Sequence, residues 1–344
     1  MTRVGLAGFG FAGRDIHVPR LLEAGLDVVA VSTRDAGRAA AARTDLPGVE
    51  VVADLDALLA VPDLDVVVLA TPSGGHAQQV RVVVDAGVAC VVDKPLAVDA
   101  ASAADTVRYA ARAGVPLTVF QNRRYDPSAV TLRGVLAAGL VGEPFRFEMR
   151  WERWRPVPKD RWRENAPPEE GGGLLLDLHT HLVDAAVTMF GRVERVAATL
   201  ASRTTVAEDD AFVLATHTSG VVSHLSATSL AAAPGPRVRL LGREGAYVLA
   251  DFEGEEHPWS GQADLDADHC GWVYRGAGPE AVPRALDVSQ GDFYRAVDRA
   301  LAAPRPQVAM PVDPWDAVHT LAVLDAARVA AREERVVTVV DPPR

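Results

Sequence analysis

Cysteine is scarce in this chain of 344 residues, which has only two, Cys90 and Cys270. At most one disulfide could form, and so low a count is typical of proteins that work in a reducing cytoplasm. Cys90 lies in the apolar run Val88–Val92, so we expect a buried core thiol there. The sequence therefore predicts a cytoplasmic protein.

Long hydrophobic runs are also missing. No stretch reaches the roughly 18 apolar residues that a membrane-spanning helix needs. The apolar run Val4–Ala7 near the N-terminus is too short, and too quickly broken by glycine, for a signal peptide. We therefore expect no membrane partner.

Basic residues are outnumbered, 35 against 46 acidic ones, and the formal net charge is −11. Nucleic-acid binding through phosphates needs a basic face, so a nucleic-acid partner is not expected. The segment Arg146–Arg163 does interleave arginine with tryptophan, as some nucleic-acid contacts do. Its alternation is that of a strand, however, and acids are interspersed. Substrate-side loops or a subunit-facing sheet explain this segment better.

The first third of the chain alternates short apolar runs with helical patterns. Val/Leu-rich strands separated by helices predict a parallel sheet that is buried on both faces. We therefore expect an α/β, doubly wound Rossmann domain over residues 1–122. The strands are expected at Val4–Gly8, Asp27–Val31, Glu50–Val52, Asp65–Ala70, Ala89–Asp93 and Leu117–Phe120. The helices are expected at His17–Ala24, Ala36–Arg43, Leu55–Leu59, Ala77–Ala86 and Ala100–Ala113.

The pattern changes in the remainder of the chain, residues 123–344. Large apolar side chains alternate with charged ones from Phe145 to Glu152, which is the period of a strand with one buried face. We expect a second, α+β domain with a mostly antiparallel sheet, for substrate binding and oligomerisation. Loops are expected over Trp259–Arg284. The amphipathic segment Trp315–Glu333 predicts a C-terminal helix that can pack back on the first domain.

A glycine loop follows the first predicted strand. Residues 8–13 read Gly-Phe-Gly-Phe-Ala-Gly and precede a helix at the start of the βαβ series, the context in which this motif binds a dinucleotide. Gly8 permits the tight turn, Gly10 lets a pyrophosphate approach the backbone, and Gly13 lets helix and strand pack closely. The intervening Phe11 and Ala12 would share the contact with the cofactor.

The end of the second strand selects the cofactor. NAD enzymes usually place an acid there to bind the ribose hydroxyls, but this chain has Ser32, Thr33 and Arg34. Arginine can bind a 2′-phosphate with a bidentate contact, and serine or threonine can donate to it. We therefore expect NADP, while Asp35, the next residue, keeps NAD open.

A predicted helix over Leu174–Phe190 carries three ionisable residues on one face. Asp177, His181 and Asp184 lie at positions i, i+4 and i+7. Such a stripe in an apolar helix is costly unless the groups are paired or used. A catalytic group, a buried hydrogen-bonded pair and a metal site all fit this spacing, but no further histidine or cysteine cluster accompanies it, and we expect no metal.

The order of motifs along the chain resembles the Gfo/Idh/MocA oxidoreductase family, from residue 4 to about 330. The motifs are the glycine loop, Thr71-Pro72-Ser73, Asp93-Lys94-Pro95, and Gly171-Gly172-Gly173 leading into Asp177, His181 and Asp184. Two further stretches, Asn122–Asp126 and Arg161–Glu164, look most like the NADP-dependent scyllo-inositol dehydrogenases. The family usually has glutamate where Asp93 stands and glycine where His179 stands, and the role of His179 is left open.

The resemblance implies that Lys94, Asp177 and His181 form the catalytic group. In a hydride transfer the substrate hydroxyl loses a proton, which His181 can accept near neutral pH. Lys94 would stabilise the charge that develops on the same oxygen, and Asp177 would orient Lys94 or bind a neighbouring hydroxyl. The resemblance also implies a cis Lys94–Pro95 bond.

The same resemblance suggests residues that hold the cofactor and the substrate. Besides the glycine loop and residues 32–34, the expected cofactor contacts are Thr71, Pro72, His76, Asp93 and Lys94. The expected substrate contacts are Asn122, Arg124, Tyr125, Trp162, Asp177 and His181.

These residues predict an NADP-dependent enzyme, with NAD as the other cofactor open to it. Its substrate would be a polyol, an inositol or a sugar, and its assembly a homo-oligomer, either a dimer or a tetramer. The alternative is a regulator of the same fold that senses a dinucleotide without chemistry. A metal-dependent sugar isomerase would need ligands on barrel strands and no glycine loop. Specificity lies in loops of the second domain, so the sequence does not name the substrate.

Overall fold

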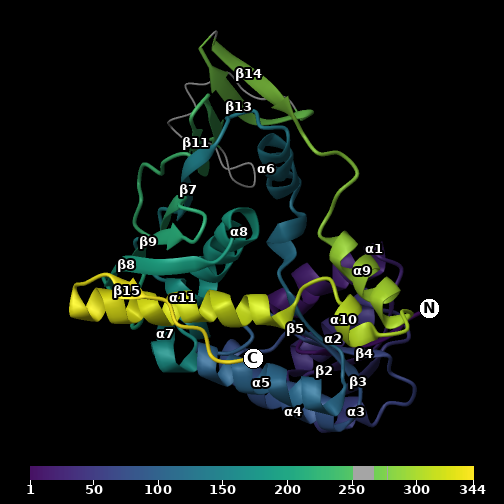
Figure 1. Ribbon diagram of the computed structural model, residues 1–344. Helices are drawn as coiled ribbons and strands as arrows, with labels where there is room; N and C mark the ends of the chain where they lie inside the picture. Colours follow the sequence, from purple (N-terminus) through teal and green to yellow (C-terminus); the bar gives the residue numbers. More distant parts are fainter. Residues whose placement is uncertain (251–266, 277) are drawn as a thin grey trace. The chain divides into compact units, whose positions relative to one another are not determined.

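The computed structural model describes residues 1–250, 267–276 and 278–344, which form two compact units (Figure 1). The first unit comprises Met1–Asn122 together with Ser289–Val318 and Pro342–Arg344. The second comprises Arg123–Val288 and His319–Asp341. The C-terminal part of the chain is therefore shared between the two units.

The first unit is built on a six-stranded sheet in the order β3-β2-β1-β4-β5-β6, with every pair parallel. Every residue of β4 and β6 is buried, as expected for a sheet covered on both faces. This order confirms the predicted Rossmann fold and places all six carboxyl ends on one edge. The strands are β1 Arg3–Ala7, β2 Asp27–Ser32, β3 Glu50–Val52, β4 Val66–Leu69, β5 Ala89–Asp93 and β6 Leu117–Phe120.

Three helices of this unit begin where the sequence supplies a capping aspartate. Asp35, Asp54 and Asp99 each accept a hydrogen bond from a backbone N–H in the first turn of the helix that follows. The helices are α1 Val18–Glu23, α2 Ala36–Asp45, α3 Leu55–Leu59, α4 His76–Asp85, α5 Ala100–Ala113, α9 Gly291–Leu301 and α10 Pro306–Ala309. The predicted helix over His17–Ala24 is preceded by a π-helix, η1 (Ala12–His17), which starts within the glycine loop.

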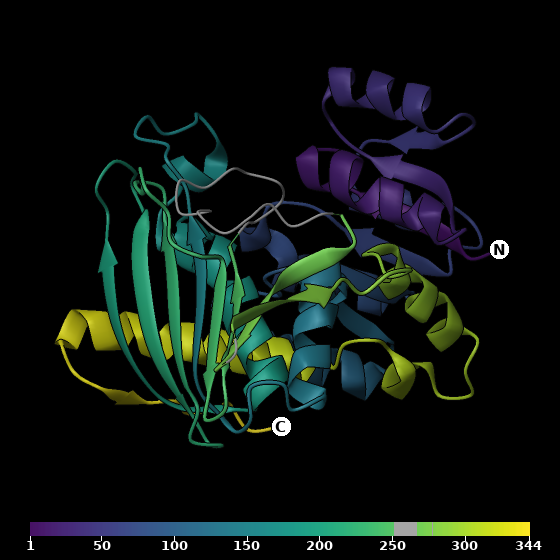
Figure 2. The ribbon, with the colours of Figure 1, turned by 90° about the horizontal axis from the view of Figure 1, so that it is seen from above.

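The second unit is built on a nine-stranded sheet in the order β14-β13-β12-β11-β7-β10-β9-β8-β15 (Figure 2). Among the pairings described, only β7 with β10 is parallel, which confirms the predicted mostly antiparallel sheet. The strands are β7 Pro144–Glu152, β8 Val193–Ala201, β9 Asp210–His217, β10 Val222–Thr228, β11 Val238–Gly242, β12 Ala246–Leu249, β13 His269–Arg275, β14 Gly278–Pro283 and β15 Val337–Thr338.

The loop prediction for Trp259–Arg284 is wrong over its second half, which forms β13 and β14, while residues 259–266 lie outside the described residues. The glycines that suggested loops are used within the hairpin. Gly271 has a φ of +79° where the register of β13 shifts, and a Cβ there would lie 2.5 Å from the Tyr247 ring. A bulge of this kind favours glycine.

Helices of the second unit include α6 (Pro127–Ala137), α7 (Trp162–Asn165) and α8 (Thr180–Phe190). The predicted helix over Leu174–Phe190 is divided, because its first part is a π-helix, η5 (Leu175–His179), which leads into α8. Both η5 and α8 pack against the sheet. The predicted C-terminal helix is α11 (Pro314–Glu333), and no helix among the described residues is long and apolar enough to cross a bilayer.

Candidate active site

The glycine loop joins β1 to η1 at the carboxyl edge of the parallel sheet. Gly8 has a φ of +95°, and a Cβ there would lie 2.7 Å from the Ala70 carbonyl oxygen. A Cβ on Gly13 would collide with the Gly8 carbonyl, whereas at Gly10 it would meet only the Arg38 side chain, at 3.9 Å. The first and third glycines therefore have backbone reasons to be glycine. The second leaves the backbone open to approach, as a bound pyrophosphate requires.

Arg38, which the sequence analysis did not select, reaches the glycine loop from the first turn of α2. Asp35 uses its carboxylate to cap that helix, accepting the Arg38 N–H at 2.7 Å. The backbone of Ser32 is also engaged, because its carbonyl accepts the Gly8 N–H at 3.0 Å. The first turn of α2 thus places a guanidinium beside the loop, while Asp35, the acid nearest the end of β2, caps this helix. The place of Arg38 in the first turn of the helix that follows Arg34 is the signal that could have identified it.

The Asp93–Lys94–Pro95 turn ends β5 on the same edge, and its Lys94–Pro95 bond is cis. Lys94 is only 9% exposed, and its backbone N–H donates to the Asp93 carboxylate at 2.8 Å. Burial alone would raise the pKa of Asp93, but the neighbouring His17 ring and the charge of Lys94 lower it to about 2. Asp93 is therefore ionised near neutral pH and holds the turn that carries Lys94.

His17 links this turn to α9. One ring nitrogen, Nε2, lies 3.8 Å from the Asp93 carboxylate, and the other, Nδ1, lies 2.5 Å from the Tyr294 hydroxyl. The ring also packs at 4.4 Å, between centroids, against Phe120 at the end of β6. The His17 ring therefore lies between the Asp93 carboxylate and the Tyr294 hydroxyl. His17 is a fully buried core residue that lies beside Asp93.

Thr71 follows β4, and His76 is the first residue of α4. Both ring nitrogens of His76 contact backbone carbonyls, Nδ1 that of Pro95 at 2.7 Å and Nε2 that of Thr71 at 2.9 Å. Burial lowers the pKa of His76, although its contacts with the two carbonyls oppose that shift. The Thr71 hydroxyl donates to Gln79 at 2.5 Å, and Pro72 follows it. His76 thus braces the cis turn, and its contact with a cofactor, like those of Thr71 and Pro72, stays a prediction.

In the second unit, η5 and α8 carry Asp177, His181 and Asp184. The wider π turn changes the angular spacing between Asp177 and His181 from that of an α-helix. Asp184 is 3% exposed and accepts two hydrogen bonds from Arg124, at 2.6 and 2.9 Å. Asp177 lies 3.4 Å from the Arg163 guanidinium. Each acid therefore has a basic partner within the same unit.

His181 is 7% exposed, and its ring stacks on Trp151 of β7, with ring centroids 5.5 Å apart. Three guanidinium groups surround the same indole, those of Arg123, Arg153 and Arg237, at 4.6 to 5.2 Å from its centroid. Stacking fixes the plane of the His181 ring. A histidine held in one plane is suited to move a proton along one direction.

The glycines at 171–173 shape the turn into η5. A Cβ on Gly172 would collide with the Ala166 carbonyl, and one on Gly173, whose φ is +92°, with the Glu208 carboxylate. Glu208 accepts the Leu175 N–H at 3.1 Å, and burial raises its pKa. The sequence analysis missed Glu208, which precedes β9 and has no motif of its own. It acts as a cap for η5 and so positions the turn before Asp177.

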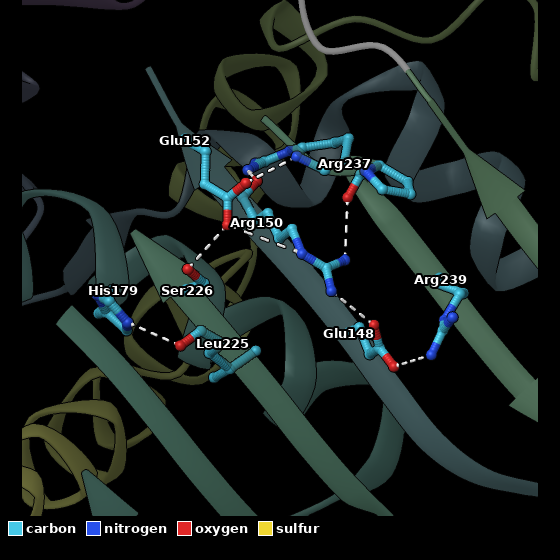
Figure 3. Close-up of polar contacts among 10 residues, drawn as sticks. Glu148, Arg150, Glu152, His179, Leu225, Ser226, Arg237 and Arg239 are labelled. Atoms are coloured by element: carbon cyan, nitrogen blue, oxygen red, sulfur yellow. Dashed lines mark hydrogen bonds and ion pairs between the residues drawn. The ribbon is translucent and has the colours of Figure 1, made fainter. Parts of the chain in front are cut away.

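His179 is a structural residue. It is fully buried, its Nε2 lies 3.2 Å from the Leu225 carbonyl of β10, and burial lowers its pKa to about 4 (Figure 3). The neutral ring therefore ties η5 to the sheet. This answers the question that the sequence left open at a position where the resemblance led us to expect glycine.

The residues predicted to contact the substrate differ in their neighbours and in the elements that carry them. Asn122 donates to Gln290 at 3.0 Å, and Arg124 is bound to Asp184. Tyr125 ends the short 3-10 helix η3 (Asn122–Tyr125), and Trp162 begins α7, where the Arg163 guanidinium lies 4.8 Å above its ring. Their contact with substrate stays a prediction. In the described part of the chain, no three histidine, cysteine or acidic side chains group as metal ligands would.

One face of the sheet at β7, β10 and β11 carries charged side chains, and we call it the charged face of the sheet (Figure 3). Glu148 is held by Arg150 at 2.7 Å and by Arg239 at 2.5 Å, and Glu152 accepts from Ser226 at 3.0 Å. The paired register of β7, β10 and β11 places these residues on one face. The sequence analysis expected a subunit-facing sheet here.

Comparison with known proteins bears out the resemblance. Residues 2–121 match the family model of the NAD-binding Rossmann-fold oxidoreductases, and residues 129–248 match the GFO/IDH/MocA C-terminal domain. The chain is 27% identical over 350 residues to the scyllo-inositol 2-dehydrogenase (NADP(+)) IolW of Bacillus subtilis, covering 97% of this chain and 95% of that protein. It is 30% identical over 345 residues to the D-apiose dehydrogenase of Paraburkholderia graminis, covering 96% and 88%. A crystal structure from Klebsiella pneumoniae has a TM-score of 0.86 and 30% identity, covering 100% of this chain and 97% of that one.

Proposed function

Because the chain belongs to the Gfo/Idh/MocA family of oxidoreductases, we propose that it transfers a hydride between NADP and the hydroxyl or carbonyl carbon of a polyol, an inositol or a sugar. The observation that carries this proposal is the Asp93–Lys94–Pro95 turn. It holds a largely buried lysine on the sheet edge that also carries the glycine loop. One relative is named for scyllo-inositol and another for D-apiose, which supports a substrate with ring or chain hydroxyls.

The open backbone at Gly10 and the nearby Arg38 fit the phosphates of a dinucleotide. When bound, the dinucleotide exchanges a hydride with the substrate carbon. Residues of the chain accept the proton of the substrate hydroxyl and stabilise the charge that develops on its oxygen. His181 accepts the hydroxyl proton on an imidazole nitrogen, and Lys94 donates a hydrogen bond from Nζ to the same oxygen. Asp177 orients Lys94 or binds a neighbouring hydroxyl.

We expect the enzyme to prefer NADP, because Arg34 and Arg38 can meet a 2′-phosphate while Asp35 caps α2. The comparison is kcat/KM with NADP and with NAD. Arg38→Ala should lower the value for NADP about 10- to 100-fold, the loss typical of a hydrogen bond to a charged group, and change the value for NAD little. Arg43→Ala, an exposed arginine at the other end of α2, is the matched control. Equal values for the two cofactors in the wild type would refute the preference.

We further expect a dimer or tetramer formed through the charged face of the sheet. Phe212 of β9 is 37% exposed and shares that face with Ser226 and Arg150. Phe212→Glu should shift the mass measured by light scattering at micromolar concentration towards the monomer. Phe145→Glu, which alters an exposed phenylalanine on the opposite face of β7, should not. A monomeric wild type would contradict this expectation.

The cytoplasm fits the two cysteines, which are both buried free thiols. Cell fractionation with an antibody against the chain tests this location, and recovery in an extracellular fraction would exclude it.

A further inference from the structure

Gln121 is a buried amide whose hydrogen-bonding capacity is unused within the residues described. It follows β6 directly and is 1% exposed, and neither its Nε2 nor its Oε1 has a hydrogen-bond partner there. Other amides near this sheet edge are paired, because Asn122 donates to Gln290 and Gln79 accepts from Thr71. An unsatisfied buried amide is costly, and such groups persist where a function uses them.

The position of Gln121 relates it to the catalytic lysine. The last paired residues of β5 and β6 are Asp93 and Phe120, so Gln121 follows its strand at the level at which Lys94 follows the neighbouring one. Ligands of doubly wound sheets bind outside the carboxyl ends of the strands. The glycine loop and Arg38 occupy the β1 and β2 ends of this edge. The phosphates and adenosine belong there, which leaves the β5 and β6 ends for the nicotinamide half.

The chemistry of the two unused atoms narrows the ligand. Nε2 can only donate and Oε1 can only accept, so one ligand group that satisfies both must also donate and accept. A phosphate or a carboxylate only accepts and would leave Oε1 unpaired. The carboxamide on a nicotinamide ring offers an N–H and a carbonyl side by side, the complement of the glutamine amide.

We propose that Gln121 binds the carboxamide of the nicotinamide ring through this pair of hydrogen bonds, an assignment that rests on the proposed use of a nicotinamide cofactor. Both polar atoms lie beneath the surface, so the side chain turns about its χ angles to meet the ring. The two hydrogen bonds gained on binding offset the cost of that turn. Gln121 is thereby a specificity residue for the reactive end of the cofactor.

The experiment is calorimetric titration, without substrate, of the preferred cofactor and of its 3-acetylpyridine analogue, which replaces the amide nitrogen by a methyl group. Wild-type protein should bind the natural cofactor up to about tenfold more tightly, the factor typical of the one hydrogen bond that the analogue cannot make. Gln121→Met, similar in length but apolar, should bind both with nearly equal affinity. Gln121→Asn, which draws the amide back by one methylene, should give an intermediate preference and serves if the methionine variant does not fold.

Thr118→Val is the matched control, because it removes a satisfied polar group from the same strand, a hydrogen bond from Thr118 to the Val312 carbonyl at 2.9 Å. It should lower the melting temperature and leave the preference for the natural cofactor intact. Gln121→Met should not lower the melting temperature, because it removes an unsatisfied group.

A Gln121→Met variant that kept the wild-type preference would overturn the assignment, and so would one that weakened only the binding of substrate. A variant that weakened both cofactors equally, with a lower melting temperature, would make Gln121 a structural residue. Wild-type protein that bound neither cofactor would overturn the proposed function and this assignment together, so the two failures are distinguishable.

Discussion

Replacing Lys94 by alanine should lower kcat about 10²- to 10³-fold and leave the dissociation constant of the dinucleotide nearly unchanged. A donor aimed at the oxygen where charge develops acts mainly in the transition state, and losing one such donor typically costs this much. Lys94 suits the role because it is largely buried and its backbone N–H is held by the Asp93 carboxylate. Turnover of the best substrate and fluorescence titration with NADPH measure the two quantities.

Lys159→Ala is the control for this experiment, because Lys159 is exposed and is the only other lysine of the chain. It should change neither quantity. A Lys94→Ala variant that kept more than about a third of the wild-type kcat, far less loss than a transition-state donor implies, would contradict the catalytic role. If cofactor affinity collapsed instead, Lys94 would be a ligand of the cofactor.

Replacing His181 by alanine should lower kcat about 10²- to 10⁴-fold, the range typical of a general base. The ring is stacked on Trp151 and is nearly buried, so alanine removes both the proton acceptor and its fixed orientation. Cofactor affinity should survive, because the glycine loop belongs to the other unit. The pH dependence of kcat/KM should lose the limb that the free enzyme's histidine contributes.

His224→Ala is the control for His181, because His224 lies half-buried on the charged face of the sheet. It should leave both turnover and the pH profile as they are. A His181→Ala variant with near-wild-type kcat and an unchanged pH profile would assign the base to another residue. Trp151→Leu separates positioning from chemistry, since it should lower kcat but keep the limb of the pH profile.

The glycine loop could be predicted from sequence because its first and third glycines have a backbone reason to be glycine. The positive φ of Gly8 and the closeness of Gly13 to the Gly8 carbonyl involve only neighbouring backbone and the end of β4. The alternation of β7 predicted a half-buried strand for the same reason. Requirements of the local backbone restrict the residue types at such positions. The fold class and the glycine loop could therefore be predicted from the sequence.

The contacts that hold the site residues in place could not be predicted from the sequence, because they join residues that are far apart along the chain. His17 and Tyr294 are separated by 277 positions, and Glu208 caps a helix 33 residues away. Periodicity shows which face of a helix is buried but does not name its partner. For the same reason, the sequence did not show that residues 289–318 cluster with the first unit.

The division of the predicted helix at Leu174–Phe190 had a different cause. The run of leucines before Asp177 fits both an α turn and a π turn, so composition did not distinguish them. The buried His179 anchors η5 to β10 through the Leu225 carbonyl, a contact across 46 positions. Tertiary contacts of this kind decide such local choices, and a single sequence does not display them.

The measurement that tests the central claim most directly is a screen of inositols, other polyols and sugars with the purified protein, following the absorbance of the reduced cofactor with NADP and with NAD. The account predicts turnover of at least one such alcohol, with a higher kcat/KM for NADP, and loss of that turnover in Lys94→Ala and His181→Ala. Tight binding of a dinucleotide without oxidation of any alcohol, or reduction of any of the corresponding carbonyls, would contradict the account and identify a regulator of the same fold.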